Sequence, residues 1–217
     1  LLGYAFYQVY QMDLKDNKEY LSVVILLSAL LLTKQISIAF YLLLSVTLIV
    51  RCCFHREVSW RLITLLIPLS FYFSWSYIVK FYELNSKFSF DRYDFLVIFD
   101  YFKGNLPELE TTIISNYLEV FLQRGLFTKL VSLSYLSASI LLTAAILIKA
   151  ITDREKRKDL IITSVFYFGG AMGYAYALLL SYTYDFGYLE GPSLTMYDRY
   201  ALTYLLMGLV LLFFLYQ

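Results

Sequence analysis

The fold is decided by the stretch from Leu130 to Asp159, in which LVSLSYLSASILLTAAILI is followed directly by KAITDREKRKD. As a helix, the first part is long enough to cross most of the roughly 30 Å of hydrocarbon in a bilayer. The second part carries five Lys or Arg residues. The rest of the chain repeats this alternation of long apolar runs and short charged gaps, which is typical of a helical membrane protein.

The composition excludes an ordinary soluble domain. Of the 217 residues, 60% are apolar and only 16% are charged, and the mean hydropathy is +0.64. A soluble domain of this size has too few interior positions for so many apolar side chains, whereas lipid can cover an apolar outer surface. The runs do not alternate as the strands of a membrane barrel do. We therefore expect an all-α, polytopic helical transmembrane bundle.

The apolar runs predict a single transmembrane domain over residues 1–217. We expect it to be a piece of a larger membrane protein, because the opening stretch to Tyr10 reads as the tail of a helix. Residues 20–50 admit two interpretations. One helix would be about 46 Å long, so a hairpin turning at Lys34 and Gln35 is favoured over one tilted span. The predicted spans are about 1–10 (the tail), 21–33, 36–50, 62–79, 130–148, 160–181 and 200–216.

The basic gaps orient the predicted bundle. Lys and Arg concentrate in cytoplasmic loops, so we expect residues 51–61 and 149–159 in the cytoplasm and residues 80–129 and 183–199 outside. Within the outer segment, apolar residues recur at helical spacing from 113 to 122, after Pro107 and Glu108, which suit a helix N-terminus. A weaker pattern at Phe95, Phe99 and Phe102 indicates a second helix. We expect amphipathic helices on the outer face, lying on the membrane surface or against the bundle.

Charged groups near the outer ends of spans are the candidate binding residues. Lys34, with Gln35, interrupts an apolar stretch, where an ammonium has to snorkel, pair or bind an anion. Asp198, Arg199 and Tyr200 open the last span. The planar guanidinium of Arg199 suits bidentate phosphate recognition, and Asp198 either orients it or caps the helix. Interfacial anchoring is the alternative explanation for these residues.

No motif selects a catalytic residue or a metal site. The chain has no phosphate-binding glycine loop and no nucleophile elbow, and the spacing of its outer acidic residues favours no particular pair. Cys52, Cys53 and His55 lack the spacing of a zinc site and are expected to be reduced thiols and a histidine at a helix end. His55, the only histidine, falls on the predicted cytoplasmic side, so we expect no histidine-centred mechanism at the outer face.

Two of these segments resemble motifs of a known family. Ser28–Lys34 (SALLLTK) resembles the apolar Gly-Leu-Ala-x-Leu-Thr-Lys stretch of the GT-C superfamily of membrane glycosyltransferases, which includes protein mannosyltransferase-like and aminoarabinose transferase-like bacterial enzymes. Asp198–Arg199–Tyr200 resembles the Arg-Tyr that opens a late helix in that family. The resemblance covers about residues 20–217 and corresponds to the C-terminal half of such an enzyme.

The resemblance implies an enzyme of the bacterial cytoplasmic (inner) membrane that moves a sugar from a polyprenyl-phosphate carrier to an acceptor on the outer face. Lys34 and Arg199 would contact the carrier phosphate, with Gln35, Asp198 and Tyr200 beside them. The catalytic acid, and a divalent metal if the reaction uses one, would belong to residues outside this chain. The expected partners are the lipid bilayer and the polyprenyl-phosphate sugar donor, with no nucleic acid.

Two other functions stay open. A flippase or exporter subunit for lipids or polysaccharides would need basic residues along the interiors of several spans, and apart from Lys34 the predicted spans contain essentially none. A polysaccharide polymerase or ligase would use the same outer cavity with a different acceptor.

Overall fold

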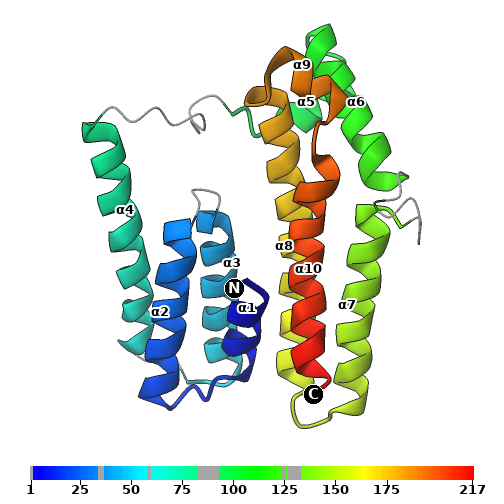
Figure 1. The fold of residues 1–217 in the computed structure, drawn as a ribbon. Helices are drawn as coiled ribbons and strands as arrows, with labels where there is room; N and C mark the ends of the chain where they lie inside the picture. The colour runs from blue at the N-terminus through cyan, green and yellow to red at the C-terminus, as the bar shows by residue number, and fades with distance from the viewer. Residues whose placement is uncertain (1, 34–36, 58–59, 83–92, 124–125, 127–132) are drawn as a thin grey trace. The chain divides into compact units, whose positions relative to one another are not determined.

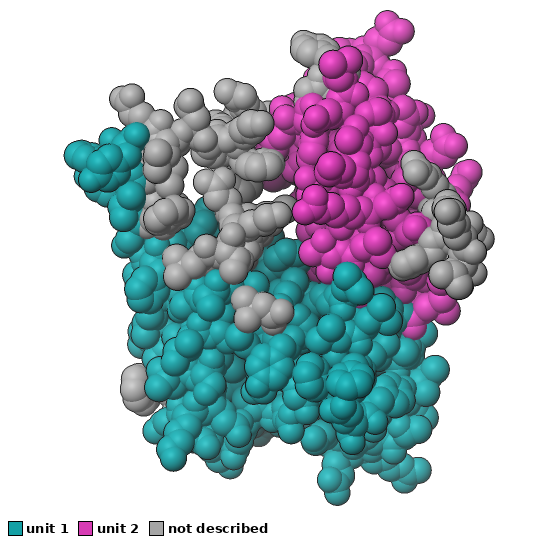
Figure 2. Space-filling model, viewed as in Figure 1, with its two compact units in different colours: residues 1–85, 142–170, 206–217 teal, residues 86–141, 171–205 magenta. Residues whose placement is uncertain are grey.

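The computed structural model describes residues 2–33, 37–57, 60–82, 93–123, 126 and 133–217. In these ranges the chain forms helices and no strand (Figure 1), so the predicted all-α fold is confirmed. The chain divides into two compact units (Figure 2), unit 1 with residues 1–85, 142–170 and 206–217 and unit 2 with residues 86–141 and 171–205. The elements are α1 Leu2–Gln11, α2 Asn17–Thr33, α3 Ser37–Phe54, the 3-10 helix η1 Trp60–Leu65, α4 Leu66–Phe81, α5 Val97–Lys103, α6 Glu108–Leu122, α7 Tyr135–Thr152, α8 Arg157–Tyr184, α9 Gly187–Ser193 and α10 Tyr197–Leu215.

Three of the described helices are long and apolar enough to cross a membrane, namely α7, α8 and α10. Shorter apolar helical segments occupy Ile38–Phe54 and Leu62–Ser74. Residues 20–50, for which one or two helices were considered, contain the two helices α2 and α3, which contact each other. The chain thus has the helices of a membrane protein, while crossings by the shorter helices stay a prediction.

Two of the long helices begin at a capping or a charged residue. Helix α7 begins at Tyr135 because the Ser134 hydroxyl oxygen accepts a hydrogen bond from the Ser137 N–H at 3.2 Å, which satisfies a free donor of the first turn. Helix α8 begins three residues before the predicted position, so Asp159 lies in its first turn. A carboxylate at that place stabilises the positive end of the helix dipole.

Close helix contacts within unit 1 depend on glycine. A Cβ atom on Gly3 would lie 2.8 Å from the Met207 carbonyl oxygen and from the Val210 Cβ atom, so α1 can approach α10 only where α1 has no side chain. Gly208 of α10 has the same role toward the Tyr167 ring of α8, which would collide with any larger residue. These approaches hold α1, α8 and α10 together in the unit that contains the polar network described below.

In unit 2, the apolar side of α6 is covered by protein. Helix α6 begins at Glu108, directly after Pro107, and its Ile113, Ile114, Tyr117 and Val120 side chains are buried. Helix α9 packs against it, since a Cβ atom on Gly191 would lie 3.0 Å from the Ile113 Cδ1 atom. The Asn116 amide also donates to the Pro192 carbonyl at 3.0 Å. Of the two positions considered for this helix, the contacts favour packing against the protein.

Candidate functional site

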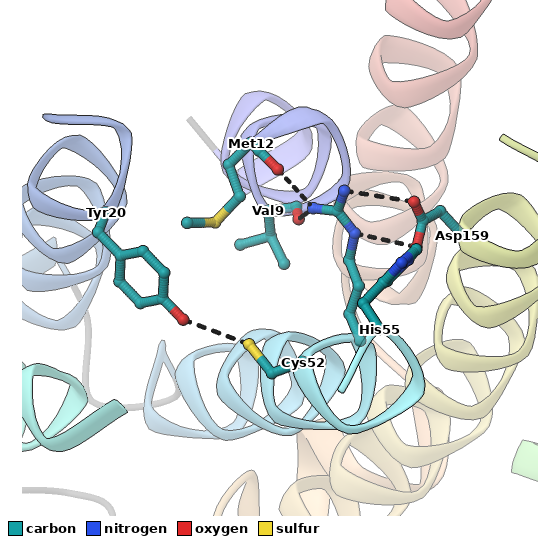
Figure 3. A network of polar contacts seen from close by, with 7 residues as sticks. Val9, Met12, Tyr20, Cys52, His55 and Asp159 are labelled. Carbon is teal, nitrogen blue, oxygen red and sulfur yellow. Dashed lines mark hydrogen bonds and ion pairs between the residues drawn. The ribbon is translucent and has the colours of Figure 1, made fainter. Parts of the chain in front are cut away.

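Among the described residues of unit 1, the guanidinium of Arg51 in the last turn of α3 makes several polar contacts with other helices. Its partners Val9, Met12 and Asp159 are labelled in Figure 3. Its Nη1 atom donates to the carbonyl oxygens of Val9 at 2.8 Å and Met12 at 3.0 Å. These carbonyls lie at the C-terminal end of α1, where the last turn of a helix leaves acceptors without partners and favours a positive charge. Arg51 therefore caps α1 from a different helix.

The same guanidinium forms an ion pair with Asp159 in the first turn of α8. The Nε–Oδ1 and Nη2–Oδ2 distances are 3.0 and 3.3 Å, and both side chains are about nine-tenths buried. The His55 Nε2 atom lies 2.8 Å from the Asp159 Oδ1 atom, and the His55 side chain is 38% exposed. Each nitrogen of the guanidinium lies close to a protein oxygen, so this network joins α1, α3 and α8.

The cysteines beside this network have different environments. Cys52 is buried, and its Sγ atom lies 3.3 Å from the Tyr20 hydroxyl of α2, whereas Cys53 is exposed. Neither cysteine forms a disulfide. A buried thiol hydrogen-bonded to a tyrosine is poorly placed for nucleophilic attack, so the pair gives no reason to assign chemistry to this end of α3.

The predicted binding residues fall in two places. Lys34 and Gln35 lie outside the described residues. Asp198, Arg199 and Tyr200 form the first turn of α10. The Arg199 side chain is exposed, and within the described part of the chain no hydrogen bond or ion pair engages its guanidinium. A common cavity for Lys34 and Arg199 therefore stays a prediction.

Aromatic residues surround the start of α10 within unit 2. The Tyr200 ring meets Phe186 edge-on at 5.9 Å between centroids, and its carbonyl accepts a hydrogen bond from the Tyr174 hydroxyl at 3.0 Å. Tyr182 stacks on Phe186 at 4.5 Å, and its hydroxyl donates to the Thr195 carbonyl at 2.8 Å. These contacts tie the turn before α10 to α8, so that the backbone carrying Arg199 is held on both sides.

The sequence spacing favoured no acidic residue of the predicted outer segments as a catalytic group. The structure gives two of them, Asp185 and Glu110 of unit 2, different surroundings. The Tyr93 hydroxyl donates to the Asp185 carboxylate, and burial, with this carboxylate, raises the pKa of Tyr93 to about 12. Burial, followed by the negative charge of Asp94, raises the pKa of Glu110. A raised pKa favours the protonated form of the Glu110 carboxyl, which is the form that a general acid needs.

Tyrosine is the residue type whose role the sequence pattern did not reveal. Its abundance is typical of membrane interfaces, yet Tyr135, Tyr167, Tyr182, Tyr197 and Tyr204 are among the largest fully buried side chains. Several buried hydroxyls donate to main-chain carbonyls, as Tyr117 does to Ala175 at 2.6 Å and Tyr135 to Ala171 at 3.0 Å. The hydroxyls of Tyr117 and Tyr135 thus satisfy backbone oxygens in the core.

No protein-family model matches this chain, and no curated protein or solved structure matches it either. Its function therefore has to be argued from its own residues.

Proposed function

We propose that the chain is the part of a polytopic, inner-membrane glycosyltransferase that holds a polyprenyl-phosphate sugar donor, with the donor phosphate on Arg199. The observation that carries the proposal is the exposed guanidinium of Arg199, without a protein partner in the described residues, in the first turn of a 19-residue apolar helix. Lys34 is proposed as the second cation of the phosphate site, and Gln35, Asp198 and Tyr200 as its neighbours.

The position of Arg199 in its helix supports an anionic ligand. The N-terminus of a helix carries a partial positive charge, so a cation in the first turn is mildly unfavourable unless an anion is close. The positive end of the helix dipole also favours an anion such as phosphate at this terminus. Arg199 adds a planar, permanently charged fork to the same place. A phosphate bound here would add its negative charge to that of Asp198, which lies in the same turn.

The helix that follows suits the rest of the carrier. After Arg199, the sequence of α10 is uncharged to its end at Leu215, and it is one of the three described helices that are long and apolar enough to cross a membrane. A polyprenyl phosphate has a charged headgroup and a long apolar tail, so it needs a cation at the boundary of the hydrocarbon and an apolar path beyond it. The first turn of α10 offers this order of groups.

The predicted orientation is supported by contacts between charged gaps. Arg51 and His55 of one basic gap meet Asp159 of the other, and Lys15 forms a 3.2 Å ion pair with Glu57. Segments that contact one another in this way belong on one side of a membrane. If that side is the cytoplasm, as the positive charge favours, alternation along the chain puts Arg199 at the outer face.

The flippase or exporter alternative receives no support from the described spans. The charges of α7, α8 and α10 lie in their end turns, with Lys149 in the last turn of α7, Asp159 in the first turn of α8 and Asp198 in the first turn of α10. A path for a charged substrate would instead need polar or charged groups along helix interiors. A polymerase or ligase would share the proposed phosphate site and differ in its acceptor.

The test measures binding of undecaprenyl phosphate to the protein in lipid nanodiscs by native mass spectrometry. We expect Arg199→Ala to weaken binding at least tenfold, while the melting temperature and yield stay unchanged. Lys149→Ala is the matched control, because Lys149 is a basic residue in an end turn of another candidate span. Equal affinity of wild type and Arg199→Ala would rule out the phosphate role of Arg199.

A further inference from the structure

Helix α5 presents an aromatic side that the described protein does not cover. Phe95, just before the helix, is 54% exposed, and Phe99 and Phe102 are 60% and 74% exposed. Their spacing of four and three residues places them on one side of a helical segment. Val97, on the opposite side, is completely buried. The segment is thus fixed to unit 2 by one side while its phenylalanines point away.

Hydrogen bonds from two tyrosines hold the start of this segment in unit 2. The Tyr176 hydroxyl of α8 donates to the Phe95 carbonyl, and Tyr93 is bonded to Asp185 just beyond the end of α8. At its other end, α5 stops at Gly104, whose φ of 73° lies in the left-handed region that glycine adopts without strain. Figure 1 shows α5, α6 and α9 gathered near the C-terminal end of α8 and the start of α10.

The length of α8 indicates how deep in a bilayer the hydrogen bond between Tyr176 and the Phe95 carbonyl lies. Helix α8 begins with the charged residues Arg157, Lys158 and Asp159, which mark one membrane boundary. Tyr176 comes nineteen residues after Arg157, a rise of about 29 Å along the helix axis. The hydrocarbon core is about 30 Å thick, so Tyr176 and the bonded Phe95 segment come at the second boundary.

The start of α10 is attached to α8 at nearly the same position along the helix axis as the Phe95 segment. The Tyr174 hydroxyl donates to the Tyr200 carbonyl at 3.0 Å, and Tyr174 precedes Tyr176 by two residues, about 3 Å along the axis. The aromatic side of α5 and the first turn of α10 with Arg199 are therefore attached to α8 within one helical turn of each other in depth.

We propose that the side of α5 formed by Phe95, Phe99 and Phe102 inserts into the bilayer at the boundary between lipid headgroups and acyl chains. Lipid fits this surface better than a protein partner. Its three rings expose about 400 Å², whereas a stable protein interface takes about 800 Å² from each partner. The charged residues of the helix, Asp100 and Lys103, form an ion pair at 3.9 Å, and the side formed by the three phenylalanines contains no charged residue itself. The inference rests on the proposed membrane location and is independent of the transferase activity.

The experiment replaces Phe99 or Phe102 by the photoreactive residue p-benzoylphenylalanine in the protein reconstituted in nanodiscs of phosphatidylethanolamine and phosphatidylglycerol. After irradiation, mass spectrometry measures the yield of covalent lipid adducts. Thr112, on the exposed side of α6, carries the same residue in the matched control. We expect the lipid adducts at positions 99 and 102 to exceed those at 112 at least fivefold.

Equal yields at the three positions, or crosslinks to a second copy of the chain in place of lipid, would overturn the inference. Its outcome is distinguishable from that of the proposed function. Lipid adducts in a protein that fails to bind undecaprenyl phosphate would keep the membrane role of α5 and remove the donor site. Phosphate binding through Arg199 without lipid adducts at α5 would do the reverse.

Discussion

Arg51 and Arg199 are both arginines in an end turn of an apolar helix, but their surroundings differ in every respect that affects function. Arg51 lies in the last turn of α3, where the helix dipole favours a cation, and its guanidinium faces two carbonyls and the Asp159 carboxylate. Arg199 lies in the first turn of α10, where the dipole opposes a cation, and its side chain is exposed. The first arrangement stabilises the fold at the expense of reactivity. The second leaves an exposed guanidinium, on which the proposed phosphate site rests.

The comparison predicts opposite responses to the loss of each guanidinium. Removal of Arg51 leaves the Asp159 carboxylate buried without its partner and two carbonyls of α1 without a donor. Removal of the Arg199 guanidinium breaks no hydrogen bond or ion pair among the described residues and relieves an unfavourable dipole interaction. Stability should therefore depend on Arg51 and ligand binding on Arg199.

The largest effect is expected for Arg51→Ala. Breaking a buried ion pair by removing one partner costs about 3–5 kcal/mol, so this variant should melt far below the wild type or fail to accumulate. The free energy of unfolding in detergent, measured by circular dichroism during denaturant titration, checks the value. Arg199→Ala is the matched control and should stay within about 0.5 kcal/mol of the wild type. If the two variants unfold alike, the contrast between the two arginines is wrong.

An intermediate effect is expected for Arg199→Lys, which keeps the charge and loses the planar fork. A lysine can attract a phosphate but cannot hold it through two parallel hydrogen bonds. We expect undecaprenyl phosphate to bind about tenfold more weakly, which corresponds to about 1.4 kcal/mol. Retention of full affinity would show that charge alone is needed, and affinity as low as that of Arg199→Ala would show that the fork geometry carries the whole interaction.

A smaller effect is expected for His55→Ala. The His55 ring touches Asp159 at 2.8 Å, but its side chain is 38% exposed, and the Arg51 contacts to Asp159 remain after the substitution. Exposed ion pairs and hydrogen bonds of this kind contribute less than about 1 kcal/mol. Denaturant titration beside Arg51→Ala would measure the difference. A loss as large as that of Arg51→Ala would make the histidine an equal member of the network.

The long apolar helices were predictable because the charge and hydropathy that predict them are local properties of the sequence. The gap from Lys149 to Asp159 marks the end of α7 and the start of α8, and the boundaries shift by a few residues where Ser134 caps α7 and where charged residues enter the first turn of α8. The Arg51–Asp159 pair was not predictable, since 108 residues separate its members and neither belongs to a motif. Arg51 was interpreted only as a marker of the cytoplasmic side.

The candidate site shows the same limit. Arg199 could be selected from the sequence because it opens an apolar run, and its exposure in the structure agrees with a binding role. Its predicted partner Lys34 lies outside the described residues, so their meeting in one cavity stays a prediction. The buried tyrosines were missed because a tyrosine at a membrane boundary and a tyrosine bonded to a core carbonyl occupy similar positions in an apolar sequence.

The smallest effect on stability is expected for Glu110 of unit 2, whose surroundings contrast with those of Asp159 beside Arg51. Asp159 has a cation on one side, whereas Glu110 is half-buried with the negative Asp94 as its neighbour, and its pKa is raised. A raised pKa means that the folded protein favours the protonated form, so Glu110 stabilises the fold at low pH and loses this contribution as the pH rises through its pKa. Glu110→Gln, which imitates the protonated form, should therefore raise the melting temperature at pH 7 and leave it unchanged near pH 4. Asp159→Asn serves as the contrast and should lower it strongly at pH 7, because it breaks the buried pair with Arg51. Melting curves of both variants at the two pH values check the signs, and a destabilised Glu110→Gln at pH 7 would mean that the ionised Glu110 has a stabilising partner after all.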